Sequence, residues 1–483
     1  MALIPSLVKL LYYPHNIGSD DAYIHLQVAR NVVSGHGWGL NPDTPVNLSS
    51  SPAFTLLLVL ISSVTVHIIA AMQALSCLAS TLGLLLIYLT VQSEAGSEQI
   101  GLLSEAFAAL SCDLWRWNGT VMEASIAFLA VALLLFQLRK RQLSPEKSLC
   151  TGVVVGLAIL LRPELLLAAA FCPLISALYS KPGHKIVSAA LLLAGAAVVV
   201  APWAIFAQLY FHSVLPTTFC AKSVPRPVIW NSVIAKQMSE LAGESFLWPA
   251  ILMAALASRV FVQRGKLMWQ RYLLPATLLL GVIAFYYLKT PGLESPGRYM
   301  LPFLPCAAVL LGLLLGDSMR GIDSRHLLTI AAIAAVLQGT TSFAINQVLL
   351  APSLRSFESE YGGAMRSAAD FIANHTRSPK ETVLAEVDVG LLAYAADGRF
   401  RIYDGGGLAS PELSHLAPAE QVQLCQPTFL IESQGDKQAE WDRKDSGRLR
   451  SIWYRRYRQH GLSQRAPYLF ANIYSTSFAQ PPP

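Results

Sequence analysis

Two adjacent carboxylates, Asp20 and Asp21, stand near the start of the chain, shortly before long apolar runs begin. Two negative charges side by side need water, a cation or a chemical role. A carboxylate held beside a substrate hydroxyl can accept its proton as a general base. The pair is therefore either the start of a solvated helix, with Asp20 capping free backbone N–H groups, or part of an active site.

Other ionisable side chains interrupt or border the apolar runs further along the chain. They are Glu123, Arg162, Glu164, Lys222 and Arg298. Chemistry on an anionic lipid needs a carboxylate base together with cations that hold a departing phosphate. Structural alternatives exist for four of them: a helix break at Arg162-Pro163, snorkelling of Lys222 and Arg298 to headgroups, and pairing of Glu123 with Arg116.

The elements that position these residues are membrane helices. The 483-residue chain is 53% hydrophobic and only 14% charged, which is too apolar for a soluble protein of this size. From Arg355 onward there are 15 Lys and Arg and 15 Asp and Glu, so the net charge of +6 belongs to the part before. The seven cysteines have no metal-type or CxxC spacing, and we interpret them as small hydrophobic residues.

Apolar segments of spanning length predict the helices that cross the membrane. They are 70–91, 120–138, 186–211, 244–262, 272–289, 297–316 and 326–350. Segment 100–114 spans if tilted, and 149–180 is expected to be two short helices that meet at Arg162-Pro163-Glu164. Segment 53–66 is too short to span and predicts an interfacial or re-entrant helix.

Basic loops set the expected orientation. Arg139 to Lys147, Lys181 with Lys185, Arg259 to Arg271, and Arg320 with Arg325 mark the cytoplasmic side by the positive-inside rule. Stepping from these loops puts the acidic pair, Glu123, the Arg162 turn, Lys222, Arg298 and the C-terminal region on the opposite, outer face. Ionisable residues at membrane depth are functional candidates because they are costly to place there.

The region from 351 to 483 predicts a small water-exposed α/β domain, because short apolar runs such as 382–385 and 428–431 alternate with turns. Its triglycine at 405–407 predicts a turn, since a phosphate-binding loop would need a following Lys and Ser or Thr. The basic, aromatic run 448–458 could contact a glycan or lipid headgroups. Nucleic acid is not expected as a partner outside a membrane.

Several stretches resemble motifs of bacterial GT-C glycosyltransferases. The first outer loop is similar in Asp20-Asp21-Ala22-Tyr23-Ile24, Ala29-Arg30-Asn31, Gly35-His36-Gly37, Asn41-Pro42 and Ser51-Pro52. Later matches follow in the same order: 119–123, Leu161-Arg162-Pro163-Glu164, Pro216 to Lys222, Pro296-Gly297-Arg298-Tyr299-Met300-Leu301-Pro302, and Val389-Gly390 with Asp404 and Gly407-Leu408. The relatives that come closest in these motifs include mycobacterial cell-wall arabinofuranosyltransferases. The chain departs from the family pattern at 47–52 and at Gln27, so the sugar is not carried over.

The resemblance implies a polytopic α-helical membrane protein with about 10–11 transmembrane helices plus interfacial helices. Residues 1–350 would form the GT-C-like catalytic domain, with the first outer loop at 14–69, and 351–483 an extracytoplasmic α/β domain. The protein would lie in the inner (plasma) membrane with its active site on the extracytoplasmic side.

The implied activity is transfer of a sugar from a polyprenyl-phosphate carrier to a hydroxyl of a cell-envelope glycan, glycolipid or protein, with inversion. Asp20 would be the base and Asp21 would orient the acceptor, while Arg162, Lys222 and Arg298 would bind the donor phosphate. The substrate-binding residues implied are Tyr23, Asn31, His36, Glu123, Glu164 and Tyr299. No cofactor is required, although paired carboxylates also suit Mg²⁺ or Mn²⁺; no residues are assigned as metal ligands.

Two other classes of function stay open. A transporter or flippase for lipid-linked sugars would place ionisable residues near mid-bilayer and show an internal repeat, and neither is clear here. A non-catalytic protein that binds a polyprenyl lipid remains compatible with the changed first-loop stretches.

Overall fold

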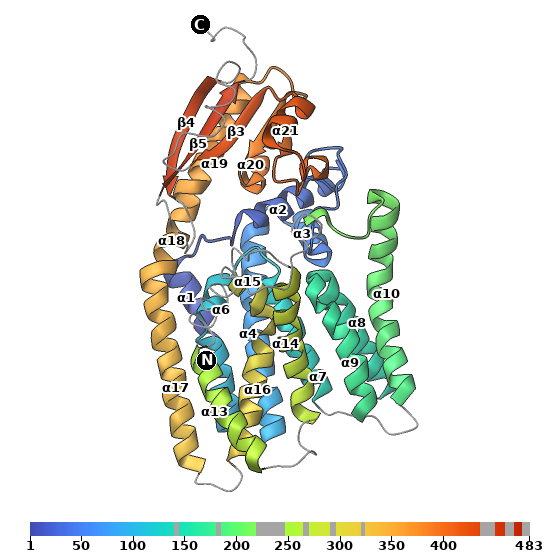
Figure 1. Cartoon of the computed structure of the whole chain (residues 1–483), viewed down its shortest axis with the longest axis vertical. Coiled ribbons are helices and arrows are strands. Elements are labelled where there is room, and N and C mark those ends of the chain that lie inside the picture. The colour runs from blue at the N-terminus through green and yellow to red at the C-terminus, as the bar shows by residue number, and fades with distance from the viewer. Residues whose placement is uncertain are drawn as a thin grey trace.

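A computed structural model of the chain describes residues 1–139, 144–179, 185–218, 247–263, 270–289, 296–319, 324–434, 450–458 and 468–475. A bundle of roughly parallel helices carries a small β-sheet at one end, with two short helices lying between them (Figure 1). The bundle consists of α1 (Ile4–Tyr12), α4 (Ile68–Ala95), α5 (Glu98–Ala109), α6 (Cys112–Trp117), α7 (Ala124–Leu138), α8 (Pro145–Leu161), α9 (Leu166–Tyr179), α10 (Lys185–Phe211), α13 (Leu247–Gln263), α14 (Gln270–Lys289), α15 (Pro296–Met300), α16 (Leu304–Ser318) and α17 (Ser324–Ile345).

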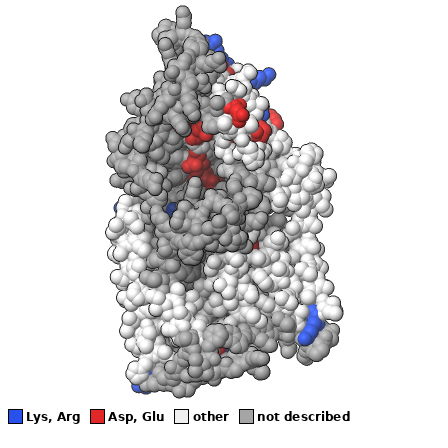
Figure 2. All heavy atoms as spheres, viewed as in Figure 1, with Lys and Arg blue, Asp and Glu red and all other residues white. Residues whose placement is uncertain are grey.

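The bundle has the surface of an integral membrane protein. Among the described helices, four are long and apolar enough to cross a membrane: Ile68–Ala95, Lys185–Phe211, Gly297–Ser318 and Arg325–Leu350. Their outward-facing side chains are large and apolar, and the described middle of one face carries almost no charge (Figure 2). Lys and Arg are visible at its lower end, and Asp and Glu gather toward the sheet together with further Lys and Arg (Figure 2). An apolar belt of this kind is stable in lipid and not in water.

The interrupted apolar segment folds as two helices, as predicted. Helix α8 ends at Leu161, a single 3₁₀ turn covers Pro163–Leu165, and α9 begins at Leu166. Arg162 takes an extended conformation (φ −153°, ψ 123°), because the ring of the following proline excludes the helical region. Two predicted spans are shorter than expected: α7 begins only at Ala124, and α5 ends at Ala109.

Helices α2 (Asp20–Val33) and α3 (Pro52–Val64) form the layer between the bundle and the sheet. Helix α3 has 13 residues, fewer than the about 20 needed to cross a bilayer, as expected for an interfacial or re-entrant helix. Helix α2 begins after Ser19 with two acidic residues in its first turn, where negative charge interacts favourably with the helix dipole. It buries one face on the bundle and the other on the C-terminal region.

A nearly continuous rod links the bundle to the sheet. Helix α17 runs through the π-helical turn η5 (Asn346–Leu350) into α18 (Ala351–Ser356), then through a second π-helical turn, η6 (Phe357–Tyr361), into α19 (Gly362–His375). Insertions of this type are common at functional positions in helices.

The C-terminal region is a five-stranded mixed sheet with helices, which confirms the predicted α/β character. The strand order is β2-β1-β3-β5-β4, with β1 parallel to both β2 and β3, and β5 antiparallel to both β3 and β4. The elements are β1 (Thr382–Glu386), α20 (Val389–Ala396), β2 (Arg401–Asp404), η7 (Pro411–Leu413), α21 (Pro418–Cys425), β3 (Phe429–Gln434), β4 (Arg450–Arg458) and β5 (Tyr468–Ser475). The triglycine follows β2 as a turn, in which Asp404 accepts hydrogen bonds from the backbone of Gly406 and Ala409.

Candidate active site

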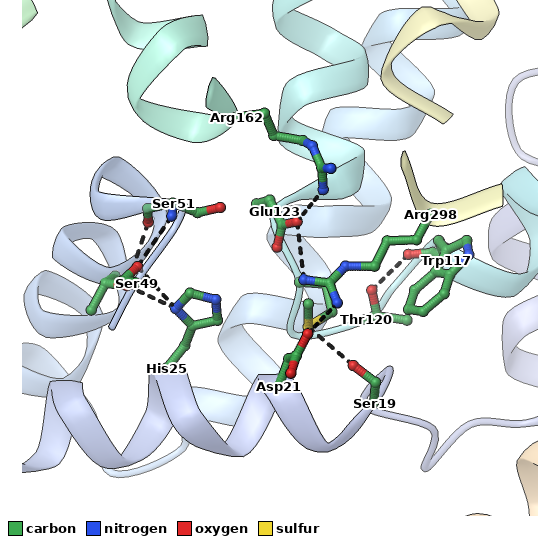
Figure 3. A network of polar contacts seen from close by, with 12 residues as sticks. Ser19, Asp21, His25, Ser49, Ser51, Trp117, Thr120, Glu123, Arg162 and Arg298 are labelled. Atoms are coloured by element: carbon green, nitrogen blue, oxygen red, sulfur yellow. Dashed lines mark hydrogen bonds and ion pairs between the residues drawn. The ribbon is translucent and has the colours of Figure 1, made fainter. Parts of the chain in front are cut away.

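Charged side chains from four distant segments meet beneath α2 at the sheet end of the bundle (Figure 3). Asp21 comes from α2, Glu123 from the turn before α7, Arg162 from the break between α8 and α9, and Arg298 from α15. The Arg298 guanidinium donates to Asp21 Oδ2 at 2.5 Å and to Glu123 Oε1 at 3.3 Å, and Arg162 donates to the same Glu123 oxygen at 2.5 Å. These four residues are called the charge cluster below.

Glu123 is the hub of the charge cluster. Its side chain is fully buried, and its Oε1 accepts from both arginines, whereas its Oε2 has no hydrogen-bond partner among the described residues. The turn that presents it contains Gly119 at φ +63°, where a Cβ would lie 2.9 Å from Cys77 Sγ. Glycine is therefore required there both by backbone conformation and by space.

The two arginines differ in how fully they are engaged. Arg162 donates from all three nitrogens: Nε to Glu164, one terminal nitrogen to Glu123, and the other to the Tyr286 hydroxyl at 3.0 Å. Arg298 leaves Nε without a hydrogen-bond partner among the described residues. Both guanidinium groups lie near the ring of Tyr299, at 4.8 and 5.7 Å from its centroid. Arg298 therefore has the greater capacity to bind another anion.

Together with Glu164, the charge cluster holds three carboxylates and two guanidinium groups. Its formal charge is −1, in surroundings where water is largely excluded. In low-dielectric surroundings each ion pair is stronger, and any rearrangement of charge changes the electrostatic energy more than it would in water.

Asp20 points away from the charge cluster, toward the C-terminal region. Its carboxylate accepts from the Tyr361 hydroxyl at 2.9 Å and from the backbone N–H groups of Gly390 and Leu391 at 2.6 and 2.8 Å. These are the second and third residues of α20, so Asp20 supplies from outside the helix the cap that an N-terminal side chain usually provides. The alternative that Asp20 caps its own helix is thus wrong, because it caps α20 instead.

Burial raises the pKa of Asp20 to about 6, although the hydrogen bonds from Leu391, Gly390 and Tyr361 oppose that rise. Gly390 is fitted closely to this contact, since a Cβ there would lie 2.3 Å from the backbone oxygen of Asp20. The neighbouring Asp21 is more open to solvent, with 32% of its side chain exposed against 8% of residue Asp20.

The remaining predicted residues do not all gather here. Glu164 and Tyr299 border the charge cluster, whereas Tyr23 packs its ring on Tyr394 of α20 at 5.4 Å. Asn31 ties the following loop by donating to the Gly39 oxygen at 2.8 Å, and the exposed His36 lies 3.4 Å from Asp43. Asn31 is ten residues along the helix from Asp21, about 15 Å away. Lys222 lies outside the described residues.

A buried polar group beside the charge cluster was not predicted. His25 Nδ1 lies 2.8 Å from Thr55 Oγ1 and 3.5 Å from Ser49 Oγ, and the two hydroxyls are 2.9 Å apart. Burial lowers the pKa of His25, with nearby Glu123 and Asp21 opposing the effect and Arg298 adding to it. The available signal was spacing: His25 is four residues after Asp21, on the same face of the helix.

The two adjacent aspartates do not form a joint cation site, because their carboxylates face different partners. Within the described ranges no group of three or more His, Cys, Asp or Glu side chains is arranged to hold a metal ion.

Comparisons with solved structures identify the fold. ArnT from Cupriavidus metallidurans in the apo state is similar, with a TM-score of 0.61 at 12% identity over 99% of this chain and 98% of that one. The structure of the same protein bound to undecaprenyl phosphate matches with a TM-score of 0.59 at 13% identity, over 99% of each chain. The archaeal oligosaccharyltransferase AglB from Archaeoglobus fulgidus, in complex with an inhibitory peptide and a dolichol-phosphate, gives 0.55 at 11% identity, over 89% of this chain and 68% of that one.

No family model and no curated protein matches the chain. At 11–13% identity the likeness to solved structures establishes a shared fold, extending over nearly the whole chain in the case of ArnT. The polytopic GT-C-like fold expected from the sequence motifs is thereby confirmed.

Proposed function

We propose that this chain is a membrane glycosyltransferase that moves a sugar from a polyprenyl-phosphate carrier to a hydroxyl group of a cell-envelope glycan, glycolipid or protein. One observation carries the proposal: a cluster at the end of a membrane bundle in which Glu123, Arg162 and Arg298 are buried and Asp21 is partly exposed. The fold agrees with it, since the ArnT structure of the same fold was obtained with undecaprenyl phosphate. By the basic loops, the site and the sheet lie on the extracytoplasmic face of the plasma membrane.

The reaction would be a direct displacement. An acceptor hydroxyl oxygen attacks the anomeric carbon, its proton passes to a carboxylate, and the bond from that carbon to the phosphate oxygen breaks. Polyprenyl phosphate leaves with the electron pair, and configuration inverts at the anomeric carbon. A cation must neutralise the charge that grows on the phosphate.

Asp21 is the better candidate for the base, in place of Asp20 as the sequence suggested. A base must reach the acceptor proton, and Asp21 is the more exposed carboxylate, beside Arg298. Both oxygens of Asp20 are occupied by donors from η6 and α20. Asp20 is therefore assigned to holding α2 in place.

Arg298 is the leading candidate for the phosphate contact. Its Nε is unengaged among the described residues, and phosphate oxygens could exchange with its present carboxylate partners. Arg162, with three hydrogen bonds, would hold Glu123 in place and support the charge. Lys222 is retained as a further phosphate-binding candidate. With a monophosphate leaving group met by cations, no metal is required, and Mg²⁺ or Mn²⁺ would be an optional addition.

The test uses the purified full chain and strains that depend on it. Native mass spectrometry with undecaprenyl phosphate measures carrier binding, and glycan analysis of a strain lacking the chain, complemented with each variant, measures transfer. Asp21→Asn should keep carrier binding and lower transfer by about 10²–10⁴-fold, as expected for loss of a general base. Arg298→Gln should weaken carrier binding, with Arg298→Lys intermediate.

Asp43→Asn serves as the matched control, because Asp43 is an exposed carboxylate in the loop after α2. Full transfer by Asp21→Asn and by Asp20→Asn would contradict the catalytic proposal. Carrier binding with no transfer by the unaltered chain would favour a lipid-binding protein or a transporter instead.

A further inference from the structure

A second cavity lies between the first loop, the segment that follows α10 and the C-terminal region. Its volume is about 320 Å³, and its walls come from residues 45–47, 211–217 and 407–415. Small-molecule sites in proteins have volumes of about 300–1,000 Å³ and are often formed where separate parts of a fold meet. The cavity is large enough for a ligand, and it is distinct from the charge cluster.

Hydrogen bonds tie the three walls together. The Thr217 backbone N–H donates to the Asn47 oxygen at 2.8 Å, and its hydroxyl donates to the Leu408 oxygen at 2.6 Å. The Asn47 side-chain amide donates to the Ser213 oxygen at 3.1 Å. A cavity with cross-bonded walls keeps its shape without a ligand, so it is a built site and not a gap between mobile loops.

The lining is neutral and mixes polar groups with apolar surface. Among the described lining residues there is no Lys, Arg, Asp or Glu, while hydroxyls and an imidazole alternate with apolar side chains (Phe211, Ser213, Leu215, Pro411, Ser414, His415). Asn47 is only 4% exposed, and its Oδ1 has no hydrogen-bond partner among the described residues. A buried acceptor without a donor is costly unless a ligand or water supplies one.

The polar and apolar groups of the lining indicate which class of ligand the cavity could bind. An uncharged molecule with many hydroxyl groups can donate to Asn47 and the backbone oxygens while resting its C–H faces on Phe211 and Pro411. That description fits a neutral saccharide. A phosphate, a uronic acid or an acidic peptide would find no cation among the described lining residues.

The cavity is connected to the charge cluster by two residues of chain. Asn47 lies in the cavity wall, and Ser49, whose Cα is at most about 7 Å away, bonds to the His25–Thr55 group. His25 is one helical turn from Asp21, and Figure 3 shows His25 between Ser49 and the charge cluster. The cavity and the charge cluster therefore lie at opposite ends of one short stretch of the first loop.

We propose that this cavity binds a neutral saccharide unit of the acceptor, away from the unit that receives the new sugar. The proposal rests on the proposed function and adds the chemical class of the acceptor. Specificity would come from Asn47 and the hydroxyl-lined wall, and not from the residues that carry the reaction.

The experiment uses the full chain in lipid nanodiscs and saturation-transfer NMR. The probes are water-soluble saccharides released from the envelope of a strain lacking the chain, separated by anion exchange into a neutral and an anionic fraction. The unaltered protein should transfer saturation to ring protons of the neutral fraction. Ser414→Trp, which fills the cavity, should reduce that signal about tenfold or more, equivalent to losing roughly 1.4 kcal/mol of binding.

Ser414→Ala, which leaves the cavity open, should keep the signal. Undecaprenyl phosphate binding by Ser414→Trp shows that the variant is folded. The proposal is overturned if Ser414→Trp and the unaltered chain give equal signals, if neither fraction binds, or if only the anionic fraction does.

Asp21→Asn separates the two proposals. Saccharide binding that survives in Asp21→Asn, with transfer lost, supports both. Saccharide binding together with undiminished transfer by Asp21→Asn supports the cavity and contradicts the assigned base. Normal carrier binding and transfer with no saccharide in the cavity contradicts this inference alone.

Discussion

Asp20 and Asp21 follow each other in the chain, yet their carboxylates serve different neighbours. Asp21 faces Arg298 on the bundle side of α2, and Asp20 holds the start of α20 on the opposite side. Consecutive helical residues point about 100° apart, so an acidic pair at a layer boundary can reach both layers. The pair thus divides into one reactive candidate and one structural clamp.

The pH dependence of stability provides a test of the clamp. The pKa of Asp20 in the folded protein, about 6, lies above the value of about 3.9 expected when unfolded, so the folded state binds the proton more tightly. Its contribution to the free energy of unfolding is fully present below about pH 4. It falls by roughly 2–3 kcal/mol as pH rises through 6.

Thermal unfolding should therefore show the unaltered chain losing stability relative to Asp20→Asn between about pH 4 and pH 6. Asp370 is exposed, so the difference in stability between the unaltered chain and Asp370→Asn should not change over this pH range. A difference between the unaltered chain and Asp20→Asn that stays constant across this range would contradict the raised pKa.

At the residue scale, the sequence predicted which residues form the charge cluster better than it predicted which hydrogen bonds each aspartate makes. Asp21, Glu123, Arg162 and Arg298 are all expected on one face because the basic loops fix which end of each apolar run lies outside. The role of Asp20 was not readable, because its acceptor capacity is filled by backbone N–H groups 370 and 371 residues away. His25 had only its four-residue spacing from Asp21 as a signal, which does not distinguish a functional histidine from one that is simply packed in the helix.

Helix α20 joins the C-terminal region to α2, in the layer between the bundle and the sheet. Arg30 reinforces the Asp20 contact by donating to the Tyr394 oxygen at 2.9 Å and to Asp397 at 2.7 Å. Asn41 pairs with both backbone groups of Ile402 on the edge strand β2, each at 2.8 Å. Three separate contacts therefore fix α2 and its loop against the C-terminal region.

Gly390→Ala should disrupt that docking, because the new Cβ would meet the Asp20 backbone 2.3 Å away. We expect faster proteolysis of the C-terminal region and reduced transfer. Gly339→Ala is the control, since its Cβ would meet only the flexible Leu110 side chain at 3.3 Å. Unchanged proteolysis in Gly390→Ala would show that the contact does not hold the two parts together.

Helices α8 and α10 pack through small residues, which allow close approach where lipid provides little hydrophobic drive. A Cβ on Gly152 would lie 2.1 Å from the Leu192 oxygen, and one on Gly195 would lie 2.3 Å from the Leu149 oxygen. Gly152→Val should therefore lower the yield of folded protein in detergent, measured by size-exclusion chromatography. The largely lipid-facing Leu157→Val should not, and an equal yield from both variants would argue against this packing.

The elements were predicted well where length and hydropathy decide them and less well where packing does. The break at Pro163 and the short α3 followed from proline chemistry and segment length. The early end of α5 and late start of α7 did not, because the segment between them folds as α6 and a tight turn that fits Trp117 and Gly119 into the bundle. The order of the five strands depends on pairing across long separations, which no local pattern encodes.

The whole molecule has a sheet end, near which the charge cluster lies, and an opposite end with basic residues, with an apolar belt between them. In the proposed orientation Arg377, exposed beyond α19, faces the outside and Arg325, at the other end of the rod, faces the cytoplasm. With native cysteines removed, Arg377→Cys should react with a membrane-impermeant maleimide in intact spheroplasts. Arg325→Cys should react only after permeabilisation, and the reverse pattern would contradict the orientation.

The long-range clamp between Asp20 and α20 has a consequence for biosynthesis. A ribosome adding roughly 5–20 residues per second needs about 20–70 s to make the 370 residues between the carboxylate and its partner Gly390. In the proposed orientation the first loop lies outside the membrane during that interval, without the α20 contact that holds α2 in place. We therefore expect chains cut short before α20 to lack transfer activity and to be cleaved faster by envelope proteases than the full chain.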